Sequence, residues 1–392
     1  MSTLRTDSNL RTVLAALFFW SFGIGLYEQL VPIYARQLGA SAVQLGTLYT
    51  LRHIALAVGF IIGWSVVDRY PRRTVMRASW VGGAPVPLLL AAAQSYIWLL
   101  PGLLLYEVTF FGLPALHAYV TQRVRSADLA PMFALMGTVS SVAFFIAPGA
   151  GGLIADRLGI RTTLFLASAF YLTSTVLMLR VKPDPAAEVP AGPARRPTRA
   201  DLEGLIPVLW ITAGMTLVWV ITVPFVSPYL REVRGLSLSY IGFLGSMQAV
   251  GGIVLTAIAG RLGNRYGVIP TLAQALGVYA VGMLFIVFGP IALLAFVAPL
   301  RARAPTHSLG QALIGSKAPA DVLGRAFAIA GALSAIVSAV GVFLSGYAYR
   351  ANPALPLLIS IALAVLLGLV MLRMRTSAQA VPQAESAPSG AR

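Results

Sequence analysis

The strongest constraint on this chain is a series of apolar runs, each about 20 residues long and nearly free of charge. A helix rises about 1.5 Å per residue, so a run of that length crosses the roughly 30 Å hydrocarbon core of a bilayer. Of the 392 residues, 58% are hydrophobic and 11% are charged, whereas about a quarter of a soluble domain is charged. The chain is therefore expected in a membrane, and a water-soluble globule is excluded.

Twelve such runs can be placed along the sequence, and each predicts a membrane-spanning helix. The first run is too long for a signal-peptide core and lacks a small-residue cleavage site, so we expect it to be retained. The expected spans are 12–35, 43–67, 74–94, 97–122, 132–155, 162–181, 206–230, 238–260, 270–288, 290–314, 326–349 and 354–374.

The basic residues predict the orientation of these spans. If both termini are cytoplasmic, 20 of the 29 Lys and Arg residues fall in inner segments, 6 in outer segments and 3 inside spans. Basic residues are concentrated on the cytoplasmic side of membrane proteins. We therefore expect a multi-pass protein of the inner (plasma) membrane with both termini in the cytoplasm. Because these loops account for the net charge of +16, we expect no nucleic-acid partner.

The longest connector between spans, Arg180–Gly204, is rich in Pro, Ala and Arg and shows no helical or strand period. Such a composition is typical of a flexible linker. It predicts an N-terminal six-helix bundle at 1–181, a cytoplasmic linker at 182–204 and a C-terminal six-helix bundle at 205–375. The remaining residues, 376–392, are expected to form a disordered cytoplasmic tail.

The two predicted bundles are internally related. Shifts of 196 and 194 residues superpose many identical residues of one half on the other without gaps. A parallel repeat of six helices explains this match, and carriers with such repeats bind their solute between the halves. The matched pairs include Pro32 with Pro228, Gly39 with Gly235, Gly46 with Gly242, Arg69 with Arg265, and Gly152 with Gly346.

Two cytoplasmic loops carry a related charged motif. The loop after the second span reads Asp68-Arg69-Tyr70-Pro71-Arg72-Arg73, and the loop after the eighth reads Gly260-Arg261-Leu262-Gly263-Asn264-Arg265-Tyr266-Gly267. With the twelve spans and the repeat, these loops make the chain resemble the major facilitator superfamily. The resemblance implies an all-α membrane protein with twelve transmembrane helices in two pseudo-symmetric six-helix bundles, which works by alternating access.

The family's loop latches neighbouring helices. The resemblance therefore implies gating roles for Asp68, Arg69 and Arg73 in the first copy, and for Asn264 and Arg265 in the second. The first copy departs from the family pattern in having a proline at the turn glycine, and the second in having Asn264 at the acid. Positive charge on the inner side alone would explain the arginines but not Asp68.

The end of the fifth span, Ala147-Pro148-Gly149-Ala150-Gly151-Gly152, resembles a glycine-proline element of the family's antiporters. Pro148 removes one helix hydrogen bond, while Gly151 and Gly152 allow close helix approach, so we expect a helix-bending element. A general packing face of small residues is the alternative. The arginine-glutamine signature that antiporters carry in the fourth span is absent, because Glu107-Val108-Thr109-Phe110-Phe111-Gly112 stands there.

Five charged residues lie well inside the apolar runs, in one layer near the membrane midplane. A charge at that depth costs several kcal/mol unless it is paired or faces water, which indicates a functional role. Static pairing that holds helices together, for example Arg52 with Glu28, is the alternative. The five candidates for substrate binding or proton coupling are Glu28, Arg52, Glu107, Arg301 and Arg303.

The tenth span predicts a broken helix, because prolines at 299 and 305 bracket its two arginines. On a regular helix Arg301 and Arg303 point to nearly opposite sides, whereas Arg303 and His307 share a face. We expect Arg301 to contact an anionic group, either of the cargo or of Glu107, its repeat equivalent. His53 and His117 are lone histidines, and five aromatic residues lie at a depth where they could line a cavity: Trp20, Tyr27, Tyr106, Phe110 and Trp219.

These features predict a carrier and not an enzyme, since no clustered acid-base or metal constellation is present. The absence of cysteine excludes thiolate metal sites, and we expect no cofactor. No Walker-type run is present, so a gradient must supply the energy. The expected partners are a small-molecule substrate, protons and the lipid bilayer, and we expect a monomer.

Two kinds of cargo remain open. The first is an amphipathic, drug-like compound, removed from the cell by antiport with protons through Glu28 or Glu107. A buried carboxyl group that loses and gains a proton can exchange it for cargo. The second is an organic anion or anionic lipid bound by Arg301 and Arg303.

Overall fold

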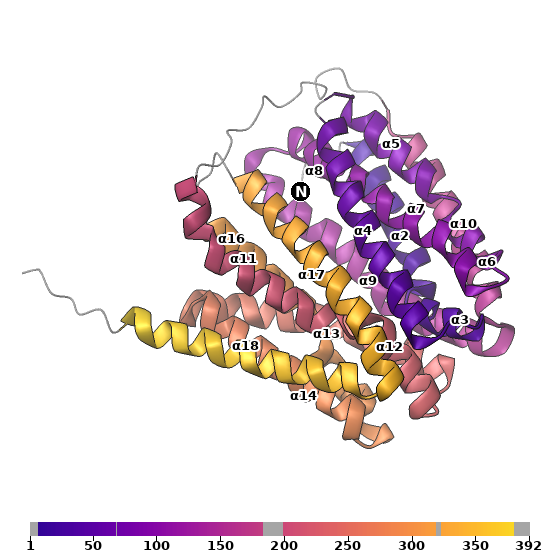
Figure 1. Ribbon diagram of the computed structural model, residues 1–392. Coiled ribbons are helices and arrows are strands. Elements are labelled where there is room, and N and C mark those ends of the chain that lie inside the picture. Colours follow the sequence, from indigo (N-terminus) through magenta and orange to yellow (C-terminus); the bar gives the residue numbers. More distant parts are fainter. Residues whose placement is uncertain (1–6, 68, 183–198, 319–322, 380–392) are drawn as a thin grey trace, which may run out of the picture.

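The computed structural model describes residues 7–67, 69–182, 199–318 and 323–379, and within these ranges all regular structure is helical (Figure 1). The first half contains α2 (Ser8–Tyr27), α3 (Val31–Gln37), α4 (Ala42–Val67), α5 (Arg72–Gly83), α6 (Val86–Ala91), η1 (Tyr96–Leu99), α7 (Leu100–Val108), η2 (Thr109–Phe111), α8 (Gly112–Arg123), α9 (Ser126–Leu158) and α10 (Ile160–Leu179). The second half contains α11 (Arg199–Val220), α12 (Val223–Pro228), η4 (Tyr229–Val233), α13 (Leu238–Tyr266), α14 (Val268–Phe288), η5 (Ile291–Leu293), α15 (Leu294–Val297), η6 (Ala298–Arg301), α16 (Ala304–Lys317), α17 (Leu323–Ala351) and α18 (Leu355–Gln379).

In these ranges, ten helical segments are long and apolar enough to cross a membrane. The two other expected spans, 74–94 and 290–314, are present as broken helices. The first divides into α5 and α6 beside Pro85, and the second is interrupted at Ala302, whose ψ of 129° is extended. Proline lacks an amide hydrogen and favours such breaks. The predicted break in the tenth span is confirmed.

The helix ends differ slightly from the expected boundaries. α11 begins at Arg199, inside the segment expected as linker, and α18 continues to Gln379, inside the expected tail. Terminal turns without an apolar pattern are difficult to place from sequence.

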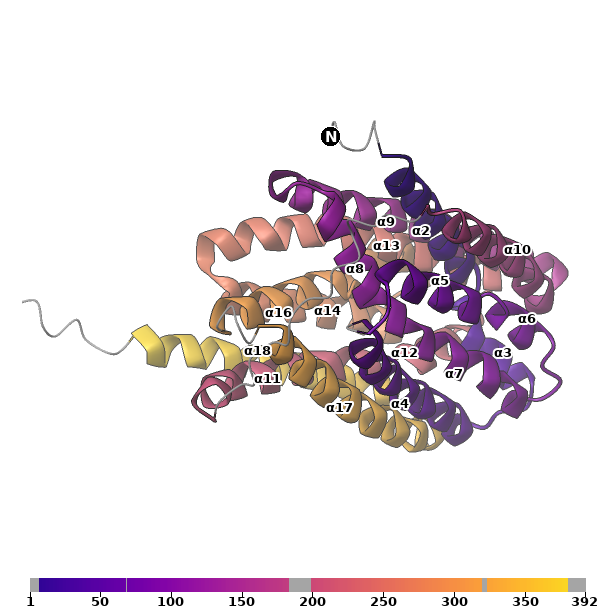
Figure 2. The ribbon, with the colours of Figure 1, turned by 90° about the horizontal axis from the view of Figure 1, so that it is seen from above.

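Helices in corresponding positions of the two halves have corresponding neighbours. In the first half α2 packs against α9 and α10, and in the second half α11 packs against α17 and α18. Between the halves, α9 lies against α13 and α4 lies against α17, as Figures 1 and 2 show. The all-α fold with two six-helix halves is confirmed.

Two glycines meet at each of the two crossings between the halves, and the repeat relates the two crossings to each other. A Cβ atom on Gly152 would lie 2.9 Å from the Cα of Gly242, and a Cβ atom on Gly46 would lie 3.1 Å from the Cα of Gly346. The sequence repeat pairs Gly152 with Gly346 and Gly46 with Gly242. The α9–α13 and α4–α17 crossings are therefore the same contact, made twice.

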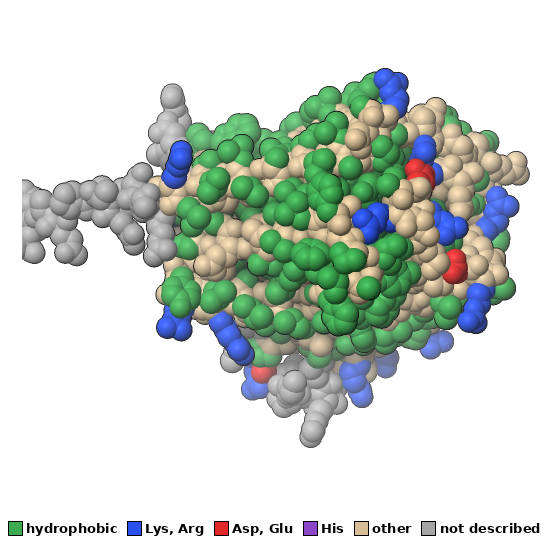
Figure 3. Space-filling model, turned by 90° about the horizontal axis from the view of Figure 1, so that it is seen from below, with side chains coloured by type: hydrophobic (Ala, Val, Ile, Leu, Met, Phe, Trp, Pro, Cys, Tyr) green, Lys and Arg blue, Asp and Glu red, His purple; other side chains and the backbone are tan. Residues whose placement is uncertain are grey.

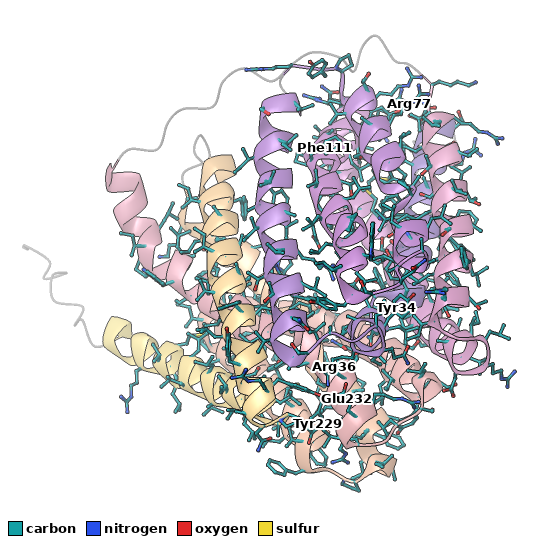
Figure 4. The ribbon with its side chains drawn as sticks, turned by 45° about the vertical axis from the view of Figure 1, so that its right-hand side comes forward. Tyr34, Arg36, Arg77, Phe111, Tyr229 and Glu232 are labelled. Atoms are coloured by element: carbon teal, nitrogen blue, oxygen red, sulfur yellow. The ribbon has the colours of Figure 1, made fainter. Side chains whose placement is uncertain are left out.

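The halves are joined at one end of the bundle, which we call the joined end. The opposite end, where α10 ends and α11 begins, is called the linker end. In Figure 4, Arg36 and Glu232 lie near each other at the joined end, while Arg77 and Phe111 lie toward the linker end.

Hydrogen bonds between described residues of the two halves extend from the joined end to the middle of the bundle. They link Arg36 with Glu232, Asp156 with Leu238 and Ser239, Thr50 with Ala339, and Gly149 with Ser246. A carrier whose halves meet at one end is closed there and has its other end available for opening.

The outer surface suits a lipid environment. Figure 3 shows a face on which hydrophobic side chains form broad, continuous areas and acidic side chains are rare. Large apolar side chains such as Phe296, Phe288 and Trp98 are 79%, 70% and 64% exposed. Water would make such a surface unstable, whereas lipid chains solvate it.

Candidate functional site

Arg52 is the centre of an ion cluster in the first half. Its Nε donates to Oε1 of Glu107 at 2.8 Å, and its Nη2 lies 2.6 Å from the same oxygen. Nη1 and Nη2 each donate to Oε1 of Glu28 at 3.2 Å. One guanidinium thus joins two acidic side chains from different helices.

Three helices hold this cluster in place. Glu28 directly follows α2, Arg52 lies on α4, and Glu107 lies near the end of α7. Gly59, two turns after Arg52 on the same face of α4, lets the helix backbones approach closely, since a Cβ there would lie 2.7 Å from the Glu107 carbonyl oxygen. This approach puts the Arg52 side chain within reach of α7.

The two carboxylates differ in their access to solvent. The side chains of Arg52 and Glu107 are 8% and 9% exposed, whereas that of Glu28 is 34% exposed. Removing one partner of a buried ion pair leaves an uncompensated charge and is strongly destabilising. Glu107 is therefore the buried partner that holds Arg52, and Glu28 is the carboxylate that solvent can reach.

Two tyrosine rings complete the surroundings of Arg52. The guanidinium carbon lies 4.8 Å from the ring centre of Tyr49 and 6.0 Å from that of Tyr106. Both distances allow a cation–π attraction. Tyr106 was among the expected cavity residues and Tyr49 was not, although the position of Tyr49 three residues before Arg52 places it on the same helix face.

A second group of polar residues surrounds Arg303, the residue that precedes α16. Its guanidinium carbon lies 4.8 Å from the ring centre of Trp219 on α11. Arg303 and His307 are exposed, and Arg303 is within electrostatic reach of His307 and of His53 on α4 in the other half. Among described residues, no acid pairs with Arg303. The group can hold an anion between the two halves.

Arg301 does not form the expected contact with Glu107. It lies in η6, which packs against α13 and α14, and is 8% exposed. Its side chain makes no hydrogen bond or ion pair with a described residue, and its Nε is fully buried. Glu107 belongs to the other half, where Arg52 occupies it. The expectation that these repeat equivalents pair is therefore wrong for this structure.

The candidate gating loops differ in what they contact. Asp68 lies outside the described residues. Arg73 donates from Nε to the Val181 carbonyl oxygen at 2.8 Å and so links α5 to the end of α10, whereas Arg69 is exposed. In the second copy, Asn264 and Arg265 are exposed near the end of α13, with Arg265 5.1 Å from the ring centre of Tyr266.

The glycine-proline element is a site of close packing. α9 runs without interruption past Pro148. A Cβ on Gly151 would overlap the Leu26 carbonyl oxygen of α2, and Gly152 meets Gly242 of α13. The two glycines thus support the packing interpretation, while bending at Pro148 stays a prediction.

Several other candidates contact aromatic side chains and, in the part of the chain that the structure describes, no charged group. Tyr27 hydrogen-bonds to Tyr171 at 3.0 Å, and Trp20 stacks on Tyr171 with ring centres 4.2 Å apart. Phe110, which is half-buried, lies edge-on to Tyr106 at 5.5 Å, and His117, which is exposed, lies edge-on to a phenylalanine ring at 5.4 Å. The contacts of Tyr27 and Trp20 are packing contacts, and His117 contacts no charged group among the described residues. Of the five aromatic candidates, Trp219 and Tyr106 lie beside the charged groups.

The sequence of this chain is similar to that of known proteins. A family model described as the Major Facilitator Superfamily matches residues 13–215 and 208–391. The enterobactin exporters EntS of Shigella boydii serotype 18 and Escherichia coli strain SE11 are each 25% identical to this chain over 415 residues, covering 99% of it and 98% of their own length.

Solved structures of similar shape agree with this family. The nucleoside transporter NupG has a TM-score of 0.76 at 13% identity, covering 94% of this chain and 99% of its own. A bacterial homologue of the iron transporter ferroportin has a TM-score of 0.70 at 16% identity, covering 93% of this chain and 98% of its own. At these identities the structural likeness concerns the fold alone.

Proposed function

Because the chain belongs to the major facilitator superfamily, we propose that it is a secondary exporter that moves a small organic anion out of the cell in exchange for protons. Family membership makes it a multi-pass membrane transporter rather than an enzyme. The identity of the cargo, the coupling ion and the direction of transport are the proposed parts.

The proposal that the cargo is anionic is based on the surroundings of Arg303. This guanidinium is exposed, stacks on Trp219 and has no acidic partner among the described residues. From 205 to 375 the sequence contains two acids, Glu232 and Asp321, both outside the middle of the expected spans. A cation at that depth is stabilised by a negative counter-charge. An anionic group of the cargo, with an aromatic or apolar part against Trp219, supplies it.

Export is supported by the relatives. The EntS proteins match this chain over nearly its whole length and carry the name exporter. Both termini are expected in the cytoplasm, so the linker end is proposed to face inward. In this arrangement the structure represents a state closed on the outside, ready to receive cargo from the cytoplasm.

Proton coupling is proposed at Glu28. Its carboxylate is reachable from solvent, and its two bonds to Arg52 are longer than those of Glu107. Protonation of Glu28 releases one side of Arg52, while Glu107 keeps the guanidinium in place. An acid that binds a proton in one state and releases it in the other can couple a proton gradient to the motion of the halves.

A second candidate function is efflux of an amphipathic, cationic drug-like compound. The observation that favours it is the same 34% exposure of Glu28, since a solvent-reachable carboxylate can bind a cationic group. In this version cargo and proton compete directly for Glu28, and Arg303 stays without a role.

A thermal-shift screen of the purified protein separates the two. Metabolites and drugs are tested at two pH values, one on each side of neutrality, because a ligand that binds the folded protein raises its apparent stability. We expect anionic hits whose effect disappears in Arg303→Gln but not in Arg350→Gln. Arg350 is a matched control, as it lies 5.5 Å from the ring of Tyr347 on the surface. Cationic hits that depend on Glu28 would overturn the anionic cargo.

A further inference from the structure

The ion pair of Arg52 and Glu107 in the first half has a counterpart in the second half that carries a different charge. The repeat superposes Arg52 on Gln248 at a shift of 196 residues and Glu107 on Arg301 at a shift of 194. Gln248 Nε2 donates to the backbone oxygen of Arg301 at 3.3 Å. Both halves therefore join the same two positions, by an ion pair in the first half and by an amide–carbonyl hydrogen bond in the second.

This difference in residue type between the two halves leaves one guanidinium, that of Arg301, without a counter-charge. In the first half, Glu107 neutralises Arg52. In the second half, the acid position holds Arg301 itself and the arginine position holds the neutral Gln248. Arg301 is 8% exposed and pairs with no acid among the described residues. A buried, unpaired charge is costly, and the cost falls when an opposite charge binds.

The Arg301 side chain is held against α14 by a glycine. A Cβ atom on Gly282 would lie 3.1 Å from Cγ of Arg301, so a larger residue would displace the side chain. The Nε atom of Arg301 is fully buried, while the residue as a whole keeps 8% of its surface exposed, which leaves an approach for a small ion.

Hydroxyl groups lie on the same side of the second half. Tyr279, one turn before Gly282 on α14, is within electrostatic reach of Arg301. Its hydroxyl lies 3.0 Å from Oγ of Ser360 and 3.3 Å from Oγ1 of Thr222. The Thr222 hydroxyl donates to the Trp219 carbonyl oxygen at 2.8 Å and the Ser360 hydroxyl donates to the Val218 carbonyl oxygen, so these two hydrogens are already in use. The Tyr279 hydroxyl makes only a long bond of 3.4 Å to the Val218 carbonyl oxygen and can turn its hydrogen toward an anion beside Arg301.

We propose that Arg301 forms an internal binding site for a small monovalent anion, separate from the cargo contact at Arg303. The ligand is either an inorganic anion such as chloride or a carboxylate. The site does not depend on the proposed cargo, because Arg301 lies buried against α14 whereas Arg303 is exposed beside Trp219. Its occupation neutralises the second half as Glu107 neutralises Arg52 in the first.

Anion-dependent stability tests this site. The full-length protein is purified in an uncharged detergent, and its melting temperature is followed by tryptophan fluorescence. Sodium isethionate, whose anion is bulky, is replaced stepwise by sodium chloride or by sodium acetate at constant ionic strength. We expect a saturable rise in melting temperature for the wild type and none for Arg301→Gln. Loss of an unpaired buried charge should also make Arg301→Gln the more stable protein in isethionate.

Each outcome bears on the proposal. A rise with chloride alone identifies an inorganic anion, and a rise with acetate identifies a carboxylate. No rise in the wild type, or the same rise in Arg301→Gln, overturns the site. Arg303→Gln should keep the full rise even though it loses cargo binding, so failure of the anion site and failure of the proposed function are distinguishable.

A second variant protects the test against misfolding. If Arg301→Gln does not fold, Tyr279→Phe removes one hydroxyl donor and leaves the packing of the ring unchanged. We expect it to need a several-fold higher anion concentration for half the rise. An unchanged half-saturating concentration would then overturn the proposed site.

Discussion

Arg36 and Glu232 occupy equivalent positions of the two halves and bind each other across the interface, with Arg36 Nε 2.8 Å from Oε1 of Glu232. Arg36 also donates to the Ala40 carbonyl oxygen at 2.6 Å, and the Tyr349 hydroxyl donates to Oε2 of Glu232 at 3.3 Å. Both side chains are about one-third exposed (29% and 34%). Exposed ion pairs contribute at most about 1 kcal/mol, so this pair can close the joined end without locking it.

We predict that Glu232→Gln shifts the protein toward the state in which the joined end is open, by about 1 kcal/mol or less. Because the sequence has no cysteine, spin labels can be placed on Ser41→Cys and Asn352→Cys, which are exposed at that end. Distances between the labels should lengthen in a larger fraction of molecules. The charge-reversed pair Arg36→Glu with Glu232→Arg should restore the original distribution, and a distribution unaffected by Glu232→Gln would contradict the gating role.

The glycine crossings predict an order of effects. Alanine at Gly152 would overlap the Leu238 carbonyl oxygen, whereas alanine at Gly46 would meet atoms at 3.0 Å or more. Overpacking costs about 1–3 kcal/mol, so Gly152→Ala should weaken the closed joined end more than Gly46→Ala. Melting temperature and label distances measure the effect. Gly137→Ala is the control on α9, since nothing lies within 4 Å of its added Cβ; equal effects at all three positions would refute the ordering.

The two carboxylates of the Arg52 cluster should respond differently to neutralisation. Glu107→Gln is expected to destabilise the protein by up to about 3–5 kcal/mol, because it removes the buried partner. Glu28→Gln should change stability less but abolish proton-driven transport in liposomes while counterflow exchange persists. Arg52→Met combined with Glu107→Gln should recover much of the lost stability. Full proton-driven transport in Glu28→Gln would exclude Glu28 as the coupling site.

The two arginines of the first charged loop provide a matched comparison. Arg73 binds the Val181 carbonyl oxygen, which also accepts from Arg77 at 2.8 Å, while Arg69 is exposed. Because Arg77 stays as a donor to this carbonyl, losing the Arg73 bond should cost about 0.5–1.5 kcal/mol, so Arg73→Gln should lower the melting temperature modestly and Arg69→Gln should not. If both variants melt alike, the Arg73 contact has no structural role.

Much of the fold could be predicted because the bilayer imposes length and apolarity on each helix. The repeat was also informative, since it paired the glycines that the structure places at equivalent crossings. Pairing of Arg52 with Glu28 was foreseen as an alternative, but Glu107 as the closer partner was not. Sequence gives the depth of a residue in the membrane, whereas the rotation of each helix about its axis depends on packing.

The same reasoning explains the wrong expectation for Arg301. Equivalent residues of two related halves meet only when they lie on the axis that relates the halves. Arg36 and Glu232 lie there, and Glu107 and Arg301 do not. Three features were not predicted: Gln248, Tyr49 and the Arg36–Glu232 pair. Predicting them requires the rotation of each helix and the position of the axis, which come from the structure. The 196-residue shift nevertheless already aligned Gln248 with Arg52.

The position of Arg36 opposite Glu232 has a consequence for the history of this chain. An ancestral half that associated with an identical copy of itself would have set Arg against Arg, or Glu against Glu, at this point. Like charges so close repel each other, so such a homodimer would have been weaker at this point than the present chain. An Arg opposite a Glu requires two halves that can mutate independently, as they can once the half has been duplicated. The glycine crossings, which are identical in both halves, carry no such requirement.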